Sequence, residues 1–297
     1  MLKDIKSLIL HLRLPFSWFL LPIFLAALCI SPNFDGKRLG LVFLILHFLV
    51  YPASNAFNSY FDKDEKSIGG LKNPPPVNKG LYYASLLLDL LAIWLAFKIS
   101  IWFAGCIVLY SIASRLYSHP SVRIKKYPVT GLIFTSFFQG YFTVCAAYLG
   151  LNGYEPWNLM NPKVQLMGLL SSLLLMAIYP LTQVYQHEED ARRGDLTISR
   201  VLGIRKTFIF SISVFIISAV GFLFYLENFL FVPQTGLFLI SIAPAAIFLV
   251  YWFRKVFIDP AAANYSKMMW FNFLASTGMN FYFFKTFLVN TNVLQVF

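Results

Sequence analysis

The stretch YPASNAFNSYFD, from Tyr51 to Asp62, shares its polar pattern with YPLTQVYQHEED, from Tyr179 to Asp190. After an initial Tyr-Pro, each stretch places two amides and one carboxylate at the same spacings: Asn55, Asn58 and Asp62, and then Gln183, Gln186 and Asp190. On a helix, these spacings of three and four residues put the side chains on one stripe about 10 Å long. Each stretch ends a long apolar run, so its polar face is expected to line a protected cavity. Two facing stripes predict a binding site.

The composition indicates a protein that crosses the membrane many times. Hydrophobic residues make up 58% of the chain, charged residues 12%, and the mean hydropathy is +0.67. A spanning helix needs about 20 mainly apolar residues. We therefore predict an all-α integral membrane protein, a single domain over residues 1–297, with nine spans at 14–32, 39–60, 80–97, 100–116, 129–150, 164–187, 207–226, 235–253 and 269–289. Residues 1–13 are expected to form a short amphipathic lead-in.

The spacing of the two polar stretches predicts an internal repeat. Four spans separate them, an even number, so spans 1–4 and 5–8 are expected to run parallel, with span 9 added. The stripes in spans 2 and 6 should then face each other across a central cavity, with both carboxylates at the same side of the membrane.

The basic residues predict the orientation. Of 24 Lys and Arg residues, 19 fall in the N-terminal segment and the even-numbered loops. Because Lys and Arg accumulate on the cytoplasmic side, the N-terminus is placed inside, the C-terminus outside, and the cavity opens to the cytoplasm. The net charge of +11 is divided among separate segments, which favours orientation and contact with the lipid bilayer over nucleic-acid binding.

Acidic residues gather in two of these cytoplasmic loops. Seven of the thirteen carboxylates lie there: Asp62, Asp64 and Glu65, and then Glu188, Glu189, Asp190 and Asp195. Such hard oxygen ligands suit Mg²⁺ bound together with substrate phosphates. Basic residues expected on the same membrane face could clamp a diphosphate: Lys72, Arg123, Lys125, Lys126, Arg192 and Arg193. The alternative interpretation is that these loops are solvated surface and that the basic residues only set the orientation.

Three segments resemble the UbiA-type intramembrane prenyltransferases. They are NSYFD at the end of span 2, the GGLKNPP loop behind it, and EEDARRGD after span 6; RLPFSW at the start of span 1 and the basic loop after span 4 add to the likeness. The resemblance implies a helical bundle that binds a polyprenyl diphosphate through Mg²⁺ and transfers the prenyl group to an aromatic or lipid acceptor. It implies Asn58, Asp62, Gln186 and Asp190 as the catalytic set, with Asn55 and Gln183 beside the diphosphate.

The chain departs from the family's two motifs at one position each. Lys66 occupies the third position of N-x-x-x-D-x-x-x-D, and Gln186 the first position of D-x-x-x-D. Asp64 or Glu65 could replace the first missing acid, and Glu188, Glu189 or Asp195 the second. We expect Asp195 to compensate, as a ligand or as an anchor that orients Arg192 and Arg193, and Glu189 to point elsewhere on the helix.

The expected chemistry is ionisation of an allylic diphosphate, assisted by Mg²⁺ and basic groups. Aromatic faces can stabilise the resulting cation, and the tyrosines that flank the stripes are the best candidates: Tyr51, Tyr60, Tyr179 and Tyr185. His47 and Asp89 lie in mid-span, where each could touch an acceptor or bond to a neighbouring helix.

Other functions remain open at this point. A membrane terpene cyclase would use the same ionisation, and a degenerate homologue would bind the diphosphate without turnover. A small-molecule transporter is also consistent with parallel repeats, although polar sites at helix ends rather than at the bilayer midplane speak against it.

Overall fold

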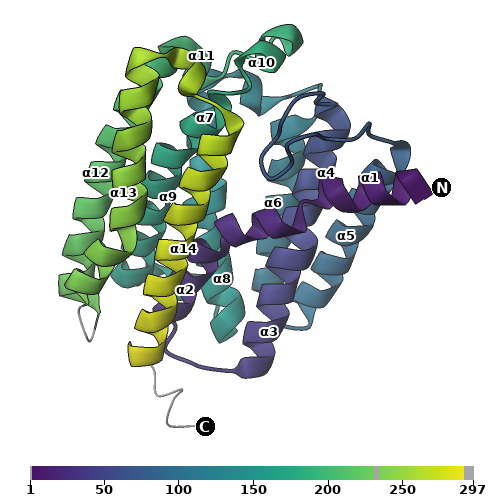
Figure 1. The fold of residues 1–297 in the computed structure, drawn as a ribbon. Helices are drawn as coiled ribbons and strands as arrows, with labels where there is room; N and C mark the ends of the chain where they lie inside the picture. The colour runs from purple at the N-terminus through teal and green to yellow at the C-terminus, as the bar shows by residue number, and fades with distance from the viewer. Residues whose placement is uncertain (1, 231–233, 291–297) are drawn as a thin grey trace.

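A computed structural model describes residues 2–230 and 234–290, and all regular elements within them are helices apart from one isolated bridge between Ile68 and Leu71. Figure 1 shows them as a bundle. The α-helices are α1 Leu2–Leu12, α2 Leu21–Cys29, α3 Gly36–Leu44, α4 Tyr51–Asp62, α5 Lys79–Phe97, α6 Ile101–Ser118, α7 Pro128–Ser136, α8 Thr143–Asn152, α9 Pro162–Gln183, α10 His187–Arg193, α11 Ile198–Leu202, α12 Ile204–Phe229, α13 Thr235–Ile258 and α14 Tyr265–Asn290. Short 3₁₀ segments are η1 Leu14–Phe19, η3 Ile124–Lys126, η5 Pro156–Met160 and η6 Pro260–Ala262.

Among the described residues, seven continuous helical segments are long and apolar enough to cross a membrane, or eight if the bent N-terminal pair counts as one span. They are Gly36–Asp62, Lys79–Phe97, Ile101–Ser118, Pro128–Asn152, Pro162–Gln183, Ile204–Phe229 and Thr235–Ile258. The expected count of nine is therefore not confirmed. The ninth expected span corresponds to α14, whose buried face carries the polar side chains of Asn272, Ser276 and Asn280.

The first expected span, 14–32, is not one straight helix. The segments Lys3–Phe19 and Leu21–Cys29 meet at an angle of 43°. Pro15 and Pro22 explain the break, because each lacks a backbone donor and disfavours helical geometry in the residue before it. Arg13 precedes η1 with a left-handed backbone, φ 49°. The lead-in predicted for residues 1–13 forms α1, which lies crosswise to α4 and α5 (Figure 1).

Two spans contain π-helical turns, η2 Ile45–Val50 and η4 Phe137–Phe142. Pro52 follows the first and cannot donate a backbone hydrogen bond, so the wider turn absorbs the lost bond and α4 continues regularly to Asp62. At the second, a Cβ on Gly140 would lie 2.6 Å from Cα of Ser172, so only glycine lets α9 approach this closely. The Ser172 hydroxyl accepts a bond from the amide of Tyr141 and donates to the Ser136 carbonyl.

The second polar stretch does not form one continuous helix, contrary to prediction. Helix α9 ends at Gln183, a turn follows, and α10 begins at His187. Pro180 removes a donor from the last turn of α9. The side chain of Gln183 accepts a bond from the amide of Ser199 instead of lying on a helical stripe with Gln186.

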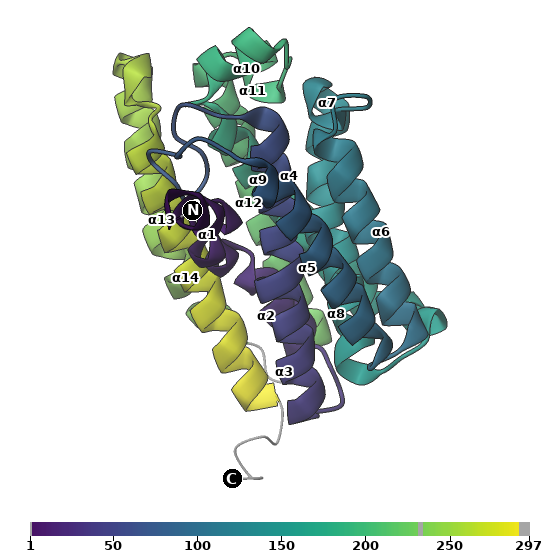
Figure 2. The ribbon, with the colours of Figure 1, turned by 90° about the vertical axis from the view of Figure 1, so that its right-hand side faces the viewer.

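The two acidic segments nevertheless lie at one end of the bundle. Figures 1 and 2 show α10, α11, the start of α7 and the loop after α4 together at the upper end. The first and last helical segments also meet, because Trp18 donates to the Thr277 hydroxyl at 3.2 Å and Asn280 donates to the Trp18 carbonyl at 3.3 Å. Large buried aromatics such as Phe24, Phe103 and Tyr225 fill the core below this end.

Candidate functional site

A cavity of about 250 Å³ opens among the helices at the end that carries the acidic segments. Its charged lining comes from the helix ends and the adjoining loops: Arg13, Asp62, Asp64, Lys125, Asp190, Arg193 and Asp195. Deeper in the helices, roughly two turns from those ends, its lining is mainly apolar and aromatic: Tyr110, Phe134, Phe138, Leu175 and Ile178. One cavity thus joins a charged mouth to an apolar interior.

Helix α4 presents its polar stripe to this cavity as expected. Asn55, Asn58 and Asp62 all line it. The buried carboxylate of Asp62 accepts bonds from Lys125 and from Arg123, the latter at 3.2 Å. The stripe therefore ends in a carboxylate held by two basic side chains from the loop after α6.

The second polar segment reaches the same cavity by a different backbone path. Gln183, Gln186 and Asp190 line it although the helix breaks between them. The amide of Gln186 donates to the Ser67 carbonyl at 3.3 Å, which ties this turn to the loop after α4. Asp190 accepts bonds of 3.3 Å from Thr197 and from Arg193.

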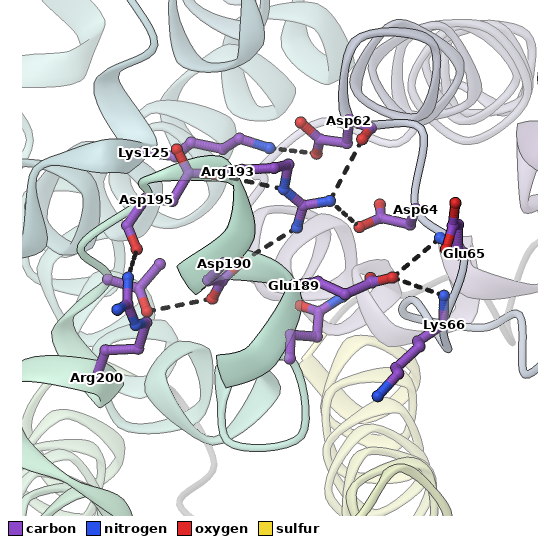
Figure 3. Close-up of polar contacts among 12 residues, drawn as sticks. Asp62, Asp64, Glu65, Lys66, Lys125, Glu189, Asp190, Arg193, Asp195 and Arg200 are labelled. Carbon is purple, nitrogen blue, oxygen red and sulfur yellow. Dashed lines mark hydrogen bonds and ion pairs between the residues drawn. The ribbon is translucent and has the colours of Figure 1, made fainter.

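Arg193 lies between the two acidic segments (Figure 3). Its guanidinium donates to the Asp64 carboxylate, to the Asp62 carbonyl at 3.3 Å and to the Asp190 carboxylate at 3.3 Å. Its Nε atom lies 3.7 Å from Oδ2 of Asp195. A single side chain from α10 thereby connects both halves of the site.

Asp195 was expected to anchor Arg192 and Arg193, but the hydrogen bonds of its carboxylate are with Arg123, and only a 3.7 Å ion pair joins it to Arg193. Asp195 is buried and accepts two bonds from Arg123, at 2.6 and 2.7 Å. This two-point contact fixes the orientation of the Arg123 guanidinium. Because Arg123 also donates to Asp62, Asp195 acts on the α4 stripe through that arginine.

Charges in this cluster shift the ionisation of the loop residues. Burial and the nearby charge of Asp62 raise the pKa of Asp64 to about 6, and the attraction of Arg193 offsets this only in part. Burial also raises the pKa of Asp190, again against the attraction of Arg193. Burial opposes the charge of Arg193, but Asp64 and Asp62 outweigh it and raise the pKa of the guanidinium. Arg193 therefore remains charged.

Glu189 does not line the cavity, as expected, but it has a structural role that was not predicted. Its buried carboxylate accepts the backbone N–H groups of Glu65 at 3.0 Å and Lys66 at 2.8 Å (Figure 3). Glu189 therefore holds the loop after α4 against α10. Beside it, Lys66, at the position where the family motif has an acid, pairs with the exposed Glu188.

Four predicted site residues are not among those that line the cavity: Glu65, Lys72, Arg123 and Arg192. Arg123 nevertheless bonds to Asp62 and Asp195, which do line it. The side chains of Glu65 and Arg192 are 84% and 58% exposed, and their closest approach is 3.9 Å. Lys72 lies in the loop after α4, where its carbonyl accepts a bond from Ser67. Glu65, Lys72 and Arg192 have the expected residue types but are exposed.

Only two of the four predicted tyrosines line the cavity. Tyr179 and Tyr185 line the cavity, whereas Tyr51 and Tyr60 do not. Tyr110, Tyr117 and Arg13 line it although the sequence analysis did not select them. Arg13 donates to the carbonyls of Asn55 and Gly69, and its place directly before the apolar run of the first span was the available signal.

The two mid-span ionisable residues bond to neighbouring helices. Asp89 of α5 pairs with Arg115 of α6 and accepts a bond from Ser111 at 3.0 Å. His47 bonds to Ser17. Neither lines the cavity, so the helix-bonding interpretation is the one that their contacts support.

The oxygen donors fit one Mg²⁺ better than two. Asn58 and Asp62 lie one helical turn apart on α4 and both face the cavity, which suits one ion that also binds phosphate oxygens. All four carboxylates of the site are held by basic side chains, Asp62 by Lys125 and Arg123 and the other three by arginines, so a metal ion would bind in competition with these contacts. Among the described residues, no three His, Cys, Asp or Glu side chains are grouped so that they could hold a metal ion by themselves.

Comparison with known proteins finds a related sequence and similar folds. Digeranylgeranylglyceryl phosphate synthase from Methanosarcina mazei is 30% identical over 186 residues, which span 59% of this chain and 60% of that relative. A solved UbiA homologue from Archaeoglobus fulgidus bound to GPP and Mg²⁺ superposes with a TM-score of 0.66 at 18% identity, over 95% of this chain and 99% of the other. A structure of a digeranylgeranylglyceryl phosphate synthase gives a TM-score of 0.60 at 20% identity, over 98% and 99%.

The two structural matches establish the fold. The family follows from the sequence, because the model of the UbiA prenyltransferase family matches residues 19–274, most of the chain including both polar stretches. The chain belongs to the UbiA prenyltransferase family.

Proposed function

We propose that this protein transfers a prenyl group from a prenyl diphosphate to an acceptor within the membrane, with Mg²⁺ bound at the charged mouth of the cavity. The observation that carries the proposal is the single cavity with a charged mouth and an apolar interior. A prenyl diphosphate has the same division, since its diphosphate is highly charged and its chain is a hydrocarbon. Such a substrate fits with its head between Asp62 and Arg193 and its tail among Phe134, Phe138 and Leu175.

The chain's own residues would neutralise the leaving diphosphate. Lys125 and Arg193 line the mouth and supply fixed positive charge. Asn58 and Asp62 would hold the Mg²⁺, which supplies Lewis-acid stabilisation of the departing oxygens. Tyr110, Tyr117 and Tyr179 present aromatic groups to the space in which positive charge would develop on the prenyl carbon. The apolar lining keeps water away from that carbon.

A lipid acceptor is favoured over an aromatic acid. The relative from Methanosarcina mazei is named for a product that contains a glyceryl phosphate. A phosphorylated glycerol lipid would need a basic group for its phosphate as well as apolar space for its chain. Arg13, which lines the cavity beside Asn55, could supply that second charge.

The membrane arrangement forms part of the proposal. The N-terminus lies in the cytoplasm, the C-terminus outside, and the cavity opens to the cytoplasmic side, as the distribution of Lys and Arg predicts. The bent N-terminal pair and α14 would bring the seven apolar spans to nine, which is consistent with a parallel repeat of spans 1–4 and 5–8 in one domain over residues 1–297.

One alternative has a specific observation in its favour. The four carboxylates of the site are all engaged with Arg or Lys, and both family motifs lack one acid, at Lys66 and Gln186. A homologue that binds prenyl diphosphate without turnover would show the same features.

Product analysis separates the two functions. The purified protein in nanodiscs is incubated with Mg²⁺ and geranyl or geranylgeranyl diphosphate, and diphosphate release is measured alone, with geranylgeranylglyceryl phosphate, and with 4-hydroxybenzoate. Release that requires the lipid phosphate and forms a diprenyl product supports the proposal. Binding without release identifies a non-catalytic homologue, and release without an acceptor accompanied by a cyclic product identifies a cyclase.

A further inference from the structure

We propose that the guanidinium of Arg193 is the second cation of the diphosphate site, so that this chain binds its substrate with one divalent ion instead of two. The inference deepens the proposed function and rests on it. Arg193 lines the cavity and connects the loop after α4 with α10 through the Asp64 and Asp190 carboxylates and the Asp62 carbonyl. A divalent ion shared by the two acidic segments would need the same oxygens.

The contacts of Arg193 are those of a bridging cation. A guanidinium has five N–H donors in one plane, so it can hold several oxygens at once and still direct an edge to a phosphate. The Arg193 side chain is 19% exposed, and the Asp64 carboxylate that it contacts is buried. Arg193 donates to the buried Asp64 carboxylate, to the Asp62 carbonyl and to the Asp190 carboxylate, so its charge lies where the two acidic segments meet.

The two departures from the family motifs remove the ligands that a second ion would use. Gln186 offers a neutral amide in place of a carboxylate, and its nitrogen donates to the Ser67 carbonyl. Lys66 brings a positive charge in place of an acid and pairs with Glu188 outside the cavity. Relative to the motifs, the site has lost two negative charges and gained one positive charge at these positions.

The charge balance of the residues at the cavity mouth also favours a single divalent ion. These residues form a cluster of four carboxylates and four basic groups, namely Asp62, Asp64, Asp190 and Asp195 with Arg13, Arg123, Lys125 and Arg193. Because the cluster itself is neutral, the negative charge that attracts divalent ions comes from the diphosphate, and Arg193 already offsets part of it. A diphosphate with one bound ion still carries net negative charge and is attracted to the arginine and lysine side chains.

The stoichiometry of Mn²⁺ binding tests the inference directly. Mn²⁺ accepts the same oxygen ligands as Mg²⁺ and is detected by electron paramagnetic resonance. The full chain in nanodiscs is titrated with Mn²⁺ in the presence of uncleavable geranyl or geranylgeranyl thiodiphosphate. One Mn²⁺ per chain is the expected result. Two per chain would overturn the role of Arg193 while leaving the proposed function intact, whereas absence of any thiodiphosphate binding would reject the proposed function itself.

Variants then assign the effect to the arginine. Arg193→Ala is expected to weaken thiodiphosphate binding by at least about tenfold, and Arg193→Lys to recover only part of it, because a lysine is a point charge without a planar fork. The double variant Arg193→Ala with Gln186→Asp restores an acid and removes the bridging cation, so Mn²⁺ stoichiometry should rise from one to two. Its retention at one would contradict the inference.

Arg192→Ala is the matched control. Arg192 is the preceding residue on α10, has the same charge and faces solvent, with ion pairs no closer than 3.9 Å. Its removal should leave thiodiphosphate binding and Mn²⁺ stoichiometry unchanged. Equal losses in Arg192→Ala and Arg193→Ala would mean that only the general positive charge of α10 matters, which would also overturn the proposal. Each variant is first checked for an unchanged melting temperature and elution volume.

Discussion

The two polar stretches have matching side chains but different backbones. In the first, a π-helical turn precedes Pro52, and α4 runs unbroken through Asn55, Asn58 and Asp62. In the second, the helix ends three residues after Pro180, and Gln183, Gln186 and Asp190 are spread over a helix end, a turn and α10. Both sets still line one cavity. Residue spacing thus predicted which side chains meet. The backbone differs because the irregular turn comes before Pro52 in the first stretch and after Pro180 in the second.

This difference suggests a division of work. The straight stripe of α4 presents oxygen donors on a rigid helix, which suits a metal ligand. The broken segment lets α10 turn over the cavity mouth, so that Arg193 and Glu189 can reach the loop after α4. The first stretch would hold the ion, and the second would hold the loop and the diphosphate.

The largest expected effect separates the two carboxylates. Asp62→Ala should weaken Mg²⁺-dependent binding of prenyl thiodiphosphate by at least about 100-fold, because it removes a direct ligand and leaves Lys125 and Arg123 without their shared partner. Asp190→Ala should cost about tenfold, because Asp190 acts through Arg193. Isothermal titration calorimetry at several Mg²⁺ concentrations measures both. Equal losses would erase the proposed division.

The next largest effect is expected on the Mg²⁺ requirement when Asp195, in the loop after α10, is changed, by comparison with Glu189 of α10. Asp195→Asn should raise the Mg²⁺ concentration for half-maximal binding about tenfold, because charge-assisted bonds to Arg123 contribute about 1.5–3 kcal/mol. Glu189→Gln is the comparison. The amide oxygen can still accept from the Glu65 and Lys66 N–H groups, which both bond to one oxygen of Glu189, so little change is expected. A larger loss in Glu189→Gln than in Asp195→Asn would refute this assignment.

The elevated pKa of Asp64 predicts a pH dependence. With a pKa of about 6, Asp64 is ionised above that pH and takes up a proton below it. Cation binding favours the ionised form, so Mg²⁺ affinity should fall several-fold as the pH drops from about 7 to about 5. The Asp64→Asn variant has no carboxyl group to protonate at this position, so its Mg²⁺ affinity should vary less over the same pH range. Mn²⁺ titrations at each pH make the comparison, and parallel curves for the two proteins would count against it.

The smallest effect compares the first amide of each stretch. Gln183→Ala should lower stability by about 1 kcal/mol, because the Gln183 oxygen caps the first turn of α11 through the Ser199 amide. Asn55→Ala loses a 3.3 Å bond to the Leu12 carbonyl and should cost about the same or less. Thermal unfolding in detergent reports both. A much larger loss for Asn55→Ala would show that the contact between α1 and α4 is more important than the cap.

The sequence could predict the membrane setting and most of the charged mouth, since apolar run length and residue spacing carry that information directly. It could not predict the break after Gln183, because Pro52 and Pro180 look alike in sequence and differ only in which turn absorbs the missing bond. It placed Glu65 and Arg192 in the site because they flank the motifs, whereas the structure exposes both. Arg13 was missed because its contacts with residues 55 and 69 depend on tertiary packing.

The junction between the first and last helical segments has a consequence for biosynthesis. Met269, Asn272 and Ser276 of α14 form part of the cavity wall, and Trp18 is joined to Thr277 and Asn280 across more than 250 residues of sequence. During translation, α4 and the loop after it are complete long before α14 has been made. The nascent chain therefore exposes a half-built polar pocket until the final helix docks. Closure of the cavity is therefore set as a late step of folding, because it depends on contacts between residues more than 250 positions apart.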